Sequence, residues 1–301
     1  MGSASGVLQV GPPAGPGFWQ GRRCRIELDR PRLMAILNVT PDSFSDGGRF
    51  LAVDAALSHA RQLAVEGADL IDVGGESTRP GAPAVSEQEE LDRVLPVIEA
   101  LRREVPLPLS IDTTKSAVAL AAVAAGADFV NDVSGLGFDP AMAAAVAQCH
   151  AGLVVMHTRG RPESMQADTR YHDLVGEVLA SLRSSLEQAA AAGVAPERIA
   201  VDPGIGFGKD VAGNLELLRR LSEFAVLGCP LLLGTSRKSF IGRVLGQDDP
   251  RQREAGTLAT VALGVVAGAR LFRVHEVAAA REAAQMAWAV CQGAQWGAPR
   301  G

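Results

Sequence analysis

One pattern occurs eight times along this chain: a short apolar run ends at a polar residue, and an Ala-rich segment of helical period follows. In the first copy, MAILNVTPDSFSDGG at residues 34–48, the apolar run stops at Asn38. A short apolar run without alternation is typical of a strand buried on both faces of a parallel sheet. Eight strand–helix units with short connections predict one α/β domain, a (β/α)8 TIM barrel. A doubly wound open sheet stays an alternative, because the number of units does not fix closure.

The expected elements follow from these runs and from the glycines that end several of the helical segments. The eight predicted strands cover residues 34–37, 70–73, 107–111, 129–130, 153–156, 199–201, 231–233 and 271–274. The predicted helices cover residues 53–66, 86–104, 115–125, 140–149, 173–192, 214–224, 253–266 and 277–292.

One domain is expected at residues 22–292, because no low-complexity linker divides the eight units. Residues 1–21 form a leader rich in Gly, Pro and Ala, which we expect to be disordered, and residues 293–301 form a polar tail. Residues 22–28 are expected to form a short edge strand that plugs one end of the fold.

Composition excludes several classes of protein. The net charge is −5 and no basic stripe occurs, so nucleic acid is not an expected partner. The four cysteines are far apart and form no CxxC pair, which indicates a reducing, cytoplasmic compartment and no zinc site. The longest uncharged apolar run, residues 256–269, is too short to span a bilayer, and no secretory signal is visible.

Polar side chains follow every predicted strand, on the side where a barrel carries its active site. For one such residue, a helix cap or a solvated loop is the simpler interpretation. Eight together indicate a binding site, because unpaired polar groups around a barrel mouth are costly unless they bind something. The groups are Asn38, the loop 74–79, Asp112, Asn131, His157, Asp202, the segment 236–238, and Arg273 with His275.

Residue types at these positions narrow the ligand. A carboxylate accepts paired N–H donors and an amide both donates and accepts, so Asp112, Asn131 and Asp202 suit a flat heterocycle with an amino group beside a ring N–H. The alternative is that Asp112 or Asp202 caps the following helix. The Gly-rich segment 204–209 has neither dinucleotide nor Walker A spacing, and its glycines would let Phe207 approach a ligand closely.

A basic cluster follows the last two predicted strands, where barrels commonly hold phosphate. Arg237, Lys238, Arg273 and His275 predict a cationic clamp for an anion. A surface cluster of basic residues is the alternative, but it leaves the neighbouring hydroxyls unexplained. Asn38 supplies a hard oxygen ligand, which suits Mg²⁺ shared with water and substrate phosphate.

Read together, these motifs make the chain resemble the dihydropteroate synthases. The resemblance covers residues 33 to about 292, and its implied fold is a (β/α)8 barrel. It implies an enzyme of tetrahydrofolate biosynthesis that joins 6-hydroxymethyl-7,8-dihydropterin diphosphate to 4-aminobenzoate and releases diphosphate with Mg²⁺. The matching stretches are ILNVTPDSFSDGG (36–48), IDVGGESTRPGA (71–82), SIDTTK (110–115), VNDVSG (130–135), VMH (155–157), VDPGIGFGK (201–209), GTSRKS (234–239) and RVH (273–275).

The resemblance also implies a role for each matching residue. The pterin would contact Asp112, Asn131, Met156, Asp202, Gly206, Phe207 and Lys238. The diphosphate would bind Arg273 and His275, and Mg²⁺ would bind Asn38. The 4-aminobenzoate and the lid loops would involve Phe44, Thr78, Arg79, Pro80 and Ser236. Diphosphate would leave first, giving a pterin-methyl cation that the aniline nitrogen attacks.

Departures from the family pattern lie beside the motifs: Ala35 for a usual Gly, Thr158 and Arg159 after His157, and Glu276 for a usual Asp. Two other functions stay open: a pterin-binding methyltransferase of the same barrel family, and a non-catalytic paralogue. The Ala-rich last two helices suggest a homodimer by analogy with the family.

Two Gly-bounded loops, residues 39–48 and 75–82, are expected to lie over the mouth without full order. We expect their closure to bury Phe44 and Pro80 beside the aminobenzoate and to exclude water, the competing nucleophile. The alternative is that Phe44 packs permanently into the barrel rim.

Overall fold

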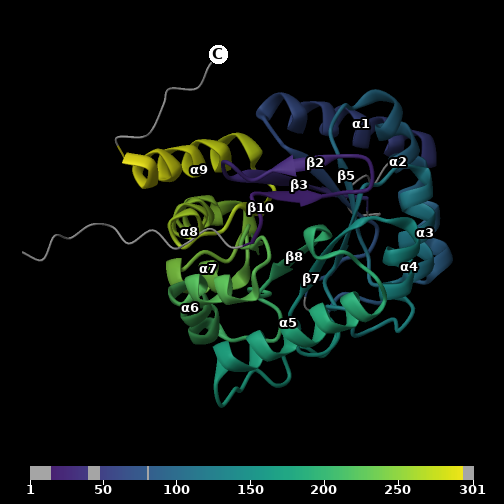
Figure 1. Ribbon diagram of the computed structural model, residues 1–301. Coiled ribbons are helices and arrows are strands. Elements are labelled where there is room, and N and C mark those ends of the chain that lie inside the picture. Colours follow the sequence, from purple (N-terminus) through teal and green to yellow (C-terminus); the bar gives the residue numbers. More distant parts are fainter. Residues whose placement is uncertain (1–14, 40–47, 80, 294–301) are drawn as a thin grey trace, which may run out of the picture.

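A closed parallel barrel forms the centre of the molecule. The computed structural model describes residues 15–39, 48–79 and 81–293 (Figure 1). Neighbouring strands pair in chain order, and a bridge between Val201 and Leu231 joins the two ends of the sheet. The open-sheet alternative is therefore wrong. The barrel strands are β3 (Arg32–Asn38), β4 (Leu70–Gly74), β5 (Leu109–Asp112), β6 (Phe129–Asp132), β7 (Gly152–Met156), β8 (Ile199–Asp202), β9 (Leu232–Leu233) and β10 (Leu271–Val274).

Helices surround the barrel (Figure 1) and bury their apolar sides against the outer face of the strands. Ser86 and Asp173 begin two of them, because each side chain accepts a backbone N–H of the first turn. Every helix among the described residues is too short or too polar to cross a membrane. The helices are α1 (Gly48–Glu66), α2 (Glu87–Glu104), α3 (Ser116–Ala125), α4 (Met142–Cys149), α5 (Leu174–Ala191), α6 (Val211–Arg219), α7 (Ser239–Leu245), α8 (Glu254–Val266) and α9 (Val277–Gln292).

Three helical predictions differ from the structure. The helix expected at residues 53–66 begins five residues earlier, at Gly48. The helix expected at residues 214–224 begins earlier, at Val211, because the Asp210 side chain accepts the Gly213 N–H and so caps its first turn. It ends at Arg219 and is followed by a 3-10 helix at Leu221–Leu227. The short helix α7 was not predicted: it begins at the end of the basic segment expected to bind an anion, and no helix was expected between residues 224 and 253.

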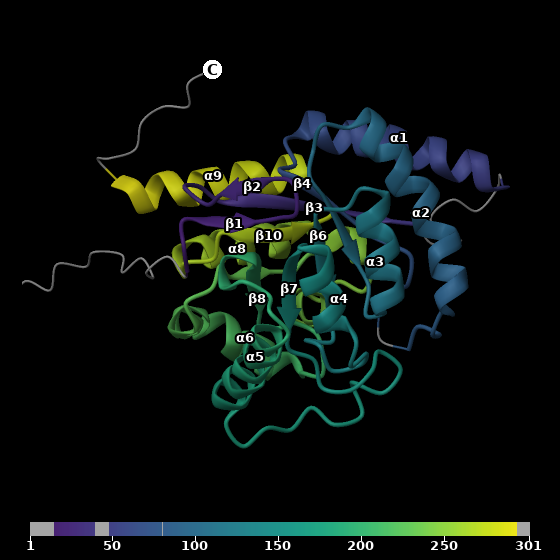
Figure 2. The ribbon, with the colours of Figure 1, turned by 45° about the vertical axis from the view of Figure 1, so that its right-hand side comes forward.

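An antiparallel hairpin, β1 (Phe18–Gln20) and β2 (Arg25–Glu27), closes the N-terminal end of the barrel (Figure 2). The Trp19 ring lies 4.0 Å from that of Phe129, and its Nε1 donates to the Arg198 carbonyl at 2.8 Å. A Cβ at Gly152 would collide with the Phe129 ring, so the start of β7 must be glycine here.

The expectation of a disordered leader through residue 21 is therefore wrong at Phe18–Gln20. The Gly/Pro-rich composition of this segment predicted disorder, but the segment contains one large apolar residue, Trp19, which is fully buried. The strand expected in residues 22–28 does plug one end of the fold, but as half of a separate hairpin and not as an edge of the barrel sheet.

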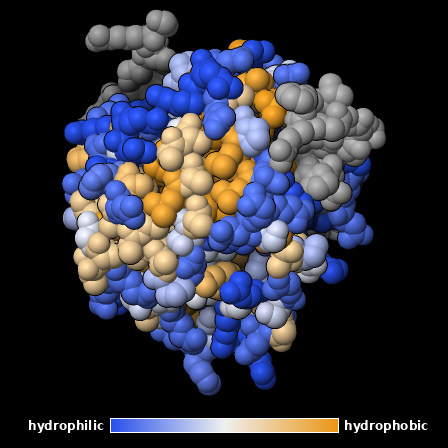
Figure 3. Space-filling model, turned by 90° about the vertical axis from the view of Figure 1, so that its right-hand side faces the viewer, coloured by the Kyte–Doolittle hydropathy of each residue, from blue (hydrophilic) through white to orange (hydrophobic). Residues whose placement is uncertain are grey.

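Figure 3 faces the side of the molecule that carries α3 and α4, whose small apolar residues appear among charged neighbours. These apolar atoms adjoin one another in the upper part of the view and are bordered by hydrophilic residues (Figure 3).

Candidate active site

A network of buried charges lies inside the barrel at the carboxyl ends of its strands. Arg273 on β10 donates through Nε to Asp72 at 2.6 Å and through Nη2 to Asp112 at 2.7 Å. Asn131 on β6 donates to the same Asp72 oxygen at 3.0 Å. Buried charges are tolerated when they are paired and hydrogen-bonded, so the arginine and the two carboxylates depend on one another.

The helix-cap alternative for Asp112 is wrong. Helix α3 begins after Lys115 without a side-chain cap, and the Ser116 N–H at its start donates to Asp139 at 2.7 Å. The Asp112 side chain points instead toward Arg273 in the barrel. Its position at the end of a buried strand is therefore not explained by helix capping.

Two buried carboxylate oxygens in this network have no hydrogen-bond partner among the described residues. They are Oδ1 of Asp72 and Oδ1 of Asp112. Burial raises the pKa of Asp112, and Arg273 opposes that rise. An unsatisfied buried acceptor costs about 1–3 kcal/mol, and a ligand that brings an N–H donor would remove this cost.

Asp202 lies at the end of β8, beside the same network. One of its oxygens accepts the Gly204 N–H at 2.7 Å, a local turn that resembles a cap, and its second oxygen lies 3.7 Å from where a Cβ of Gly234 would stand. Burial raises the pKa of Asp202 to about 6. The same Gly234 position lies 3.8 Å from Arg273 Cβ, so this second oxygen lies close to the ends of the neighbouring strands β9 and β10.

Lys238 and Phe207 form the next part of the site. The Lys238 ammonium lies 3.9 Å from the centroid of the Phe207 ring, a cation–π contact, and burial lowers the pKa of Lys238 to about 8. Gly206 has φ +86°, and a Cβ there would lie 2.8 Å from the Lys238 side chain. Phe207 and Met156 share one apolar cluster, so the predicted stacking residues do lie together.

His275 and Ser236 pair at the mouth of the barrel. The Ser236 hydroxyl lies 2.9 Å from His275 Nδ1 and accepts the His275 backbone N–H at 3.2 Å. This geometry suits the tautomer in which Nδ1 accepts the Ser236 hydroxyl proton and Nε2 carries the ring hydrogen. Burial lowers the pKa of His275 to about 3, so the ring is neutral near pH 7.

The predicted cationic clamp is not a cluster of four cations. His275 is neutral, Arg237 forms an ion pair with Glu276, and Arg273 is held by two carboxylates. What the structure does bring to this end is one ammonium, two guanidinium groups that already form ion pairs, and an uncharged imidazole.

Asn38 ends β3 next to Asp112. The bare Gly74 lies between them, since a Cβ there would stand 3.5 Å from Asn38 Oδ1 and 3.8 Å from Asp112 Oδ2. Among the described residues, no group of three or more His, Cys, Asp or Glu side chains could hold a metal. A single hard oxygen at the mouth fits Mg²⁺, which usually takes one or two protein ligands and shares the rest with water and substrate phosphate.

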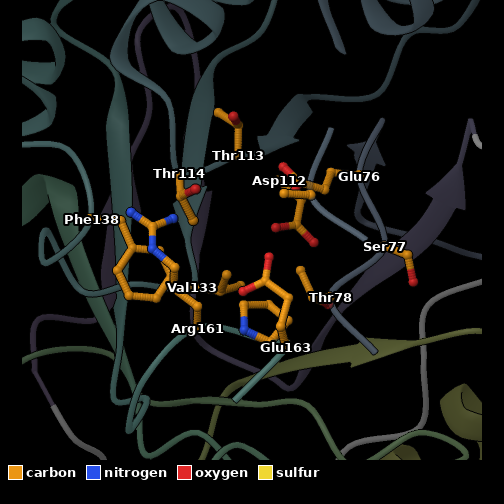
Figure 4. A pocket seen from close by; sticks show the side chains of 12 residues that line it. Glu76, Ser77, Thr78, Asp112, Thr113, Thr114, Val133, Phe138, Arg161 and Glu163 are labelled. Carbon is orange, nitrogen blue, oxygen red and sulfur yellow. The ribbon is translucent and has the colours of Figure 1, made fainter. Parts of the chain in front are cut away.

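A hollow of about 450 Å³, counting space open to solvent, lies beside this network (Figure 4). Asp112 and Thr78 line it, and the Arg161 guanidinium lies 4.5 Å from the Phe138 ring at its wall. The exposed Arg79 lies in the same loop as Thr78. Phe44 and Pro80 lie outside the described residues, so the lid prediction for them stays a prediction.

Comparison with known proteins identifies the family. The model of the pterin binding enzymes matches residues 34–275. The chain is 49% identical to the dihydropteroate synthase of a Synechocystis strain over 258 residues, 86% of this chain and 89% of that protein. A Xanthomonas albilineans dihydropteroate synthase structure with 4-aminobenzoic acid is 47% identical with a TM-score of 0.86, covering 92% of this chain and 98% of that one.

The same relative in complex with 7,8-dihydropteroate has a TM-score of 0.82 at 44% identity, covering 92% of this chain and 99% of that one. The chain belongs to the dihydropteroate synthase family. As a member of this family it is a transferase, and its barrel is the fold of the solved dihydropteroate synthases.

Sequence reasoning missed two residues of this dihydropteroate synthase site. Asp72, fully buried, holds both Arg273 and Asn131, and its only signal was a carboxylate inside the apolar run 70–73. Lys209 was quoted in a motif, but its buried position beside His157 was not foreseen. Both pairings join distant parts of the chain, which no local pattern reports.

Proposed function

We propose that the chain condenses (7,8-dihydropterin-6-yl)methyl diphosphate with 4-aminobenzoate, giving 7,8-dihydropteroate and diphosphate, as a step of tetrahydrofolate biosynthesis. The observation that carries this proposal is the buried Asp112 Oδ1 without a partner among the described residues, beside Asn131 at the strand ends. Family membership supports it, as do the two Xanthomonas albilineans structures, one with 4-aminobenzoic acid and one with 7,8-dihydropteroate.

The pterin would bind deep in the barrel. Asp112 and Asp202 would accept N–H groups of its amino-pyrimidine edge, and Asn131 would complete the mixed pattern of that edge. Lys238 would donate to a ring acceptor, while Phe207 and Met156 would pack against the ring. The two carboxylates would also stabilise positive charge that develops on the pterin when its leaving group departs.

Diphosphate would lie at the mouth between β3 and β10. The neutral His275 would donate from Nε2, and Arg273, whose side chain is 20% exposed, would add positive charge. Mg²⁺, held by Asn38, would neutralise charge on the diphosphate oxygens when bound. The bond between the pterin methylene carbon and oxygen breaks, and its electron pair leaves with the diphosphate.

The amine of 4-aminobenzoate would then attack the methylene carbon with its lone pair and release a proton to solvent. An anilinium is a strong enough acid to need no dedicated base. Thr78, Arg79 and Ser236 would frame this second substrate, with the exposed Arg79 facing its carboxylate. Phe44 and Pro80 would exclude water from the same place.

We further propose that the chain works as a cytoplasmic homodimer. All four cysteines are free, which suits a reducing compartment. Helices α8 and α9 expose Leu263, Met286 and Val290, with 61%, 66% and 54% of their surface accessible. Light scattering on the purified chain tests the dimer, and a monomer at micromolar concentration would contradict it.

The decisive experiment mixes the protein with Mg²⁺, the pterin diphosphate and 4-aminobenzoate. We expect release of diphosphate that depends on 4-aminobenzoate, together with dihydropteroate detected by mass spectrometry. Omitting Mg²⁺ should reduce the rate. Binding of the pterin diphosphate without release would instead indicate a non-catalytic paralogue.

A further inference from the structure

Lysine is used at only three places in this chain. Of 29 Lys and Arg residues, only Lys115, Lys209 and Lys238 are lysines. Each follows the carboxyl end of a barrel strand, β5, β8 and β9 respectively. An ammonium is a compact point charge and a guanidinium is a planar fork, so the two are not interchangeable where space is tight. Lys238 is already placed at the pterin, whereas Lys209 has no role in the reaction described so far.

Lys209 is a buried cation held by neutral groups. Its Nζ lies 2.8 Å from His157 Nδ1, 2.9 Å from the Gly204 carbonyl and 2.8 Å from the Phe207 carbonyl. These three acceptors match the three N–H groups of an ammonium. Only 3% of the residue is exposed, and among the described residues no carboxylate forms an ion pair with it. Burial opposes the charged form of the ammonium, while the charge of Asp202 attracts it from beyond ion-pair distance. Burying a cation without a direct ion pair is costly, so fold stability alone is a poor reason for its presence.

The two carbonyls that Lys209 binds bracket a tight turn. The Phe207 N–H donates to the Gly204 carbonyl at 3.1 Å, and Gly204 has φ +71°. A Cβ at Gly204 would collide with the His157 carbonyl, so the turn is pressed against the end of β7. The ring of Phe207, which leaves this turn, lies over the Lys238 ammonium.

We propose that Lys209 is a positioning residue for the pterin site: together with His157 it fixes the Gly204–Phe207 turn and thereby holds the Phe207 ring over Lys238. This role rests on the proposed function for its effect on turnover, but the placement of the ring does not. A guanidinium at this position would not point three donors at three converging acceptors.

A matched control lies in the same segment. Tyr171 Oη donates to the Gly208 carbonyl at 2.9 Å, just beyond the turn that Lys209 binds. Tyr171→Phe therefore removes one side-chain bond to this segment and leaves the Gly204 and Phe207 carbonyls untouched. A general loosening of the segment would affect both variants alike.

The first test uses the protein without substrates. Protein labelled only in its lysines gives three side-chain NMR signals, and Lys238→Arg assigns the signal of Lys238. At pH 6, below the pKa of Lys209, which burial lowers to about 7, all three ammonium groups are charged. The ε-protons of Lys238 lie over an aromatic face and should be shifted upfield. We expect Lys209→Met to abolish this shift and Tyr171→Phe to keep it.

The second test measures turnover. In Lys209→Met, kcat/KM for the pterin diphosphate should fall roughly tenfold to a hundredfold, as expected for a misplaced contact group. Tyr171→Phe should change it by no more than about twofold. Lys209→Arg should not rescue the loss. If Lys209→Met does not fold, Lys209→Gln, which keeps two donors, takes its place with the same expectations.

An unchanged Lys238 signal in the folded Lys209 variant would overturn the proposal, as would a loss of turnover no larger than in Tyr171→Phe. Wild-type protein that shows the upfield Lys238 signal but makes no dihydropteroate would refute the proposed function and leave the positioning role standing. The two failures are therefore distinguishable.

Discussion

Asp202 is the residue whose charge tests pterin binding most directly, because it is buried and its second oxygen lies near the strand-end residues Gly234 and Arg273. Asp202→Asn should retain the fold and weaken pterin diphosphate binding by roughly 2–5 kcal/mol, as for a buried charged hydrogen bond that loses its partner. Calorimetry gives the affinity. Asp210→Asn is the control, since Asn also caps helices well and should bind as the wild type does. Equal affinity in both variants would remove Asp202 from the site.

A variant of His275 tests the diphosphate contact separately from the pterin contacts. Because its neutral ring donates only through Nε2, His275→Ala should weaken binding of the pterin diphosphate and leave binding of the pterin alcohol nearly unchanged. Arg273→Ala is a poorer test, since it strands Asp72 and Asp112 as unpaired buried charges. An equal loss for both ligands in His275→Ala would show that the histidine supports the barrel instead.

Three buried groups at the pterin site, Asp112, Asp202 and Lys238, set a pH window for the free enzyme. Asp202 accepts ring N–H groups only when ionised, so with a raised pKa of about 6 its function is lost as pH falls through that value. Lys238 donates as a cation only below its lowered pKa of about 8. Asp112 must also be ionised to accept a ring N–H, and burial raises its pKa to about 7, so the acid limb should lie between about 6 and 7. The profile of kcat/KM should therefore be a bell with its alkaline limb near 8. In Lys238→Arg the alkaline limb should disappear; a limb that persists at the same pH belongs to another group.

At the scale of secondary-structure elements, the strands and most helices could be predicted from local pattern, because a strand buried on both faces shows an uninterrupted apolar run. The predicted strand at residues 271–274 and helix at 277–292 match β10 and α9 at both ends. The hairpin could not be predicted, since three-residue strands carry no periodicity and β1 lies in a Gly/Pro-rich segment.

The site could be predicted only in part, for a related reason. The prediction that Asp112, Asn131 and Asp202 lie together at one end of the barrel is confirmed, because each lies at the end of a strand. The sequence did not show that Arg273 forms hydrogen bonds with Asp72 and Asp112, because these partners are 201 and 161 residues away along the chain. Partner choice among converging side chains depends on the closed barrel and not on any local motif.

The hairpin β1–β2 gives a prediction about stability alone. Trp19 is fully buried, and Trp19→Ala should lower the free energy of unfolding by about 3–5 kcal/mol, the usual loss for a large buried ring. Urea denaturation measures it. The folded variant should keep kcat and KM, because the hairpin closes the N-terminal end of the barrel. Gln20→Ala, at a half-buried neighbour on the same strand, is the control and should cost much less.

For the whole molecule, the barrel separates stability from chemistry: the hairpin plugs one end of the strands and the substrate residues occupy the other. Trp19 contacts Phe129 at the start of β6, whereas Asp202 ends β8, and the two share no hydrogen-bond partner among the described residues. Distant sites without shared partners usually add within about 0.5 kcal/mol.

We therefore expect Trp19→Ala and Asp202→Asn to be additive in the double variant. Its unfolding free energy should equal the wild-type value less the two single losses, and its affinity for the pterin diphosphate should equal that of Asp202→Asn alone. Denaturation and calorimetry on all four proteins close this cycle. A coupling well above about 0.5 kcal/mol would mean that the plug transmits strain along the strands to the mouth, and the two ends would then not be independent.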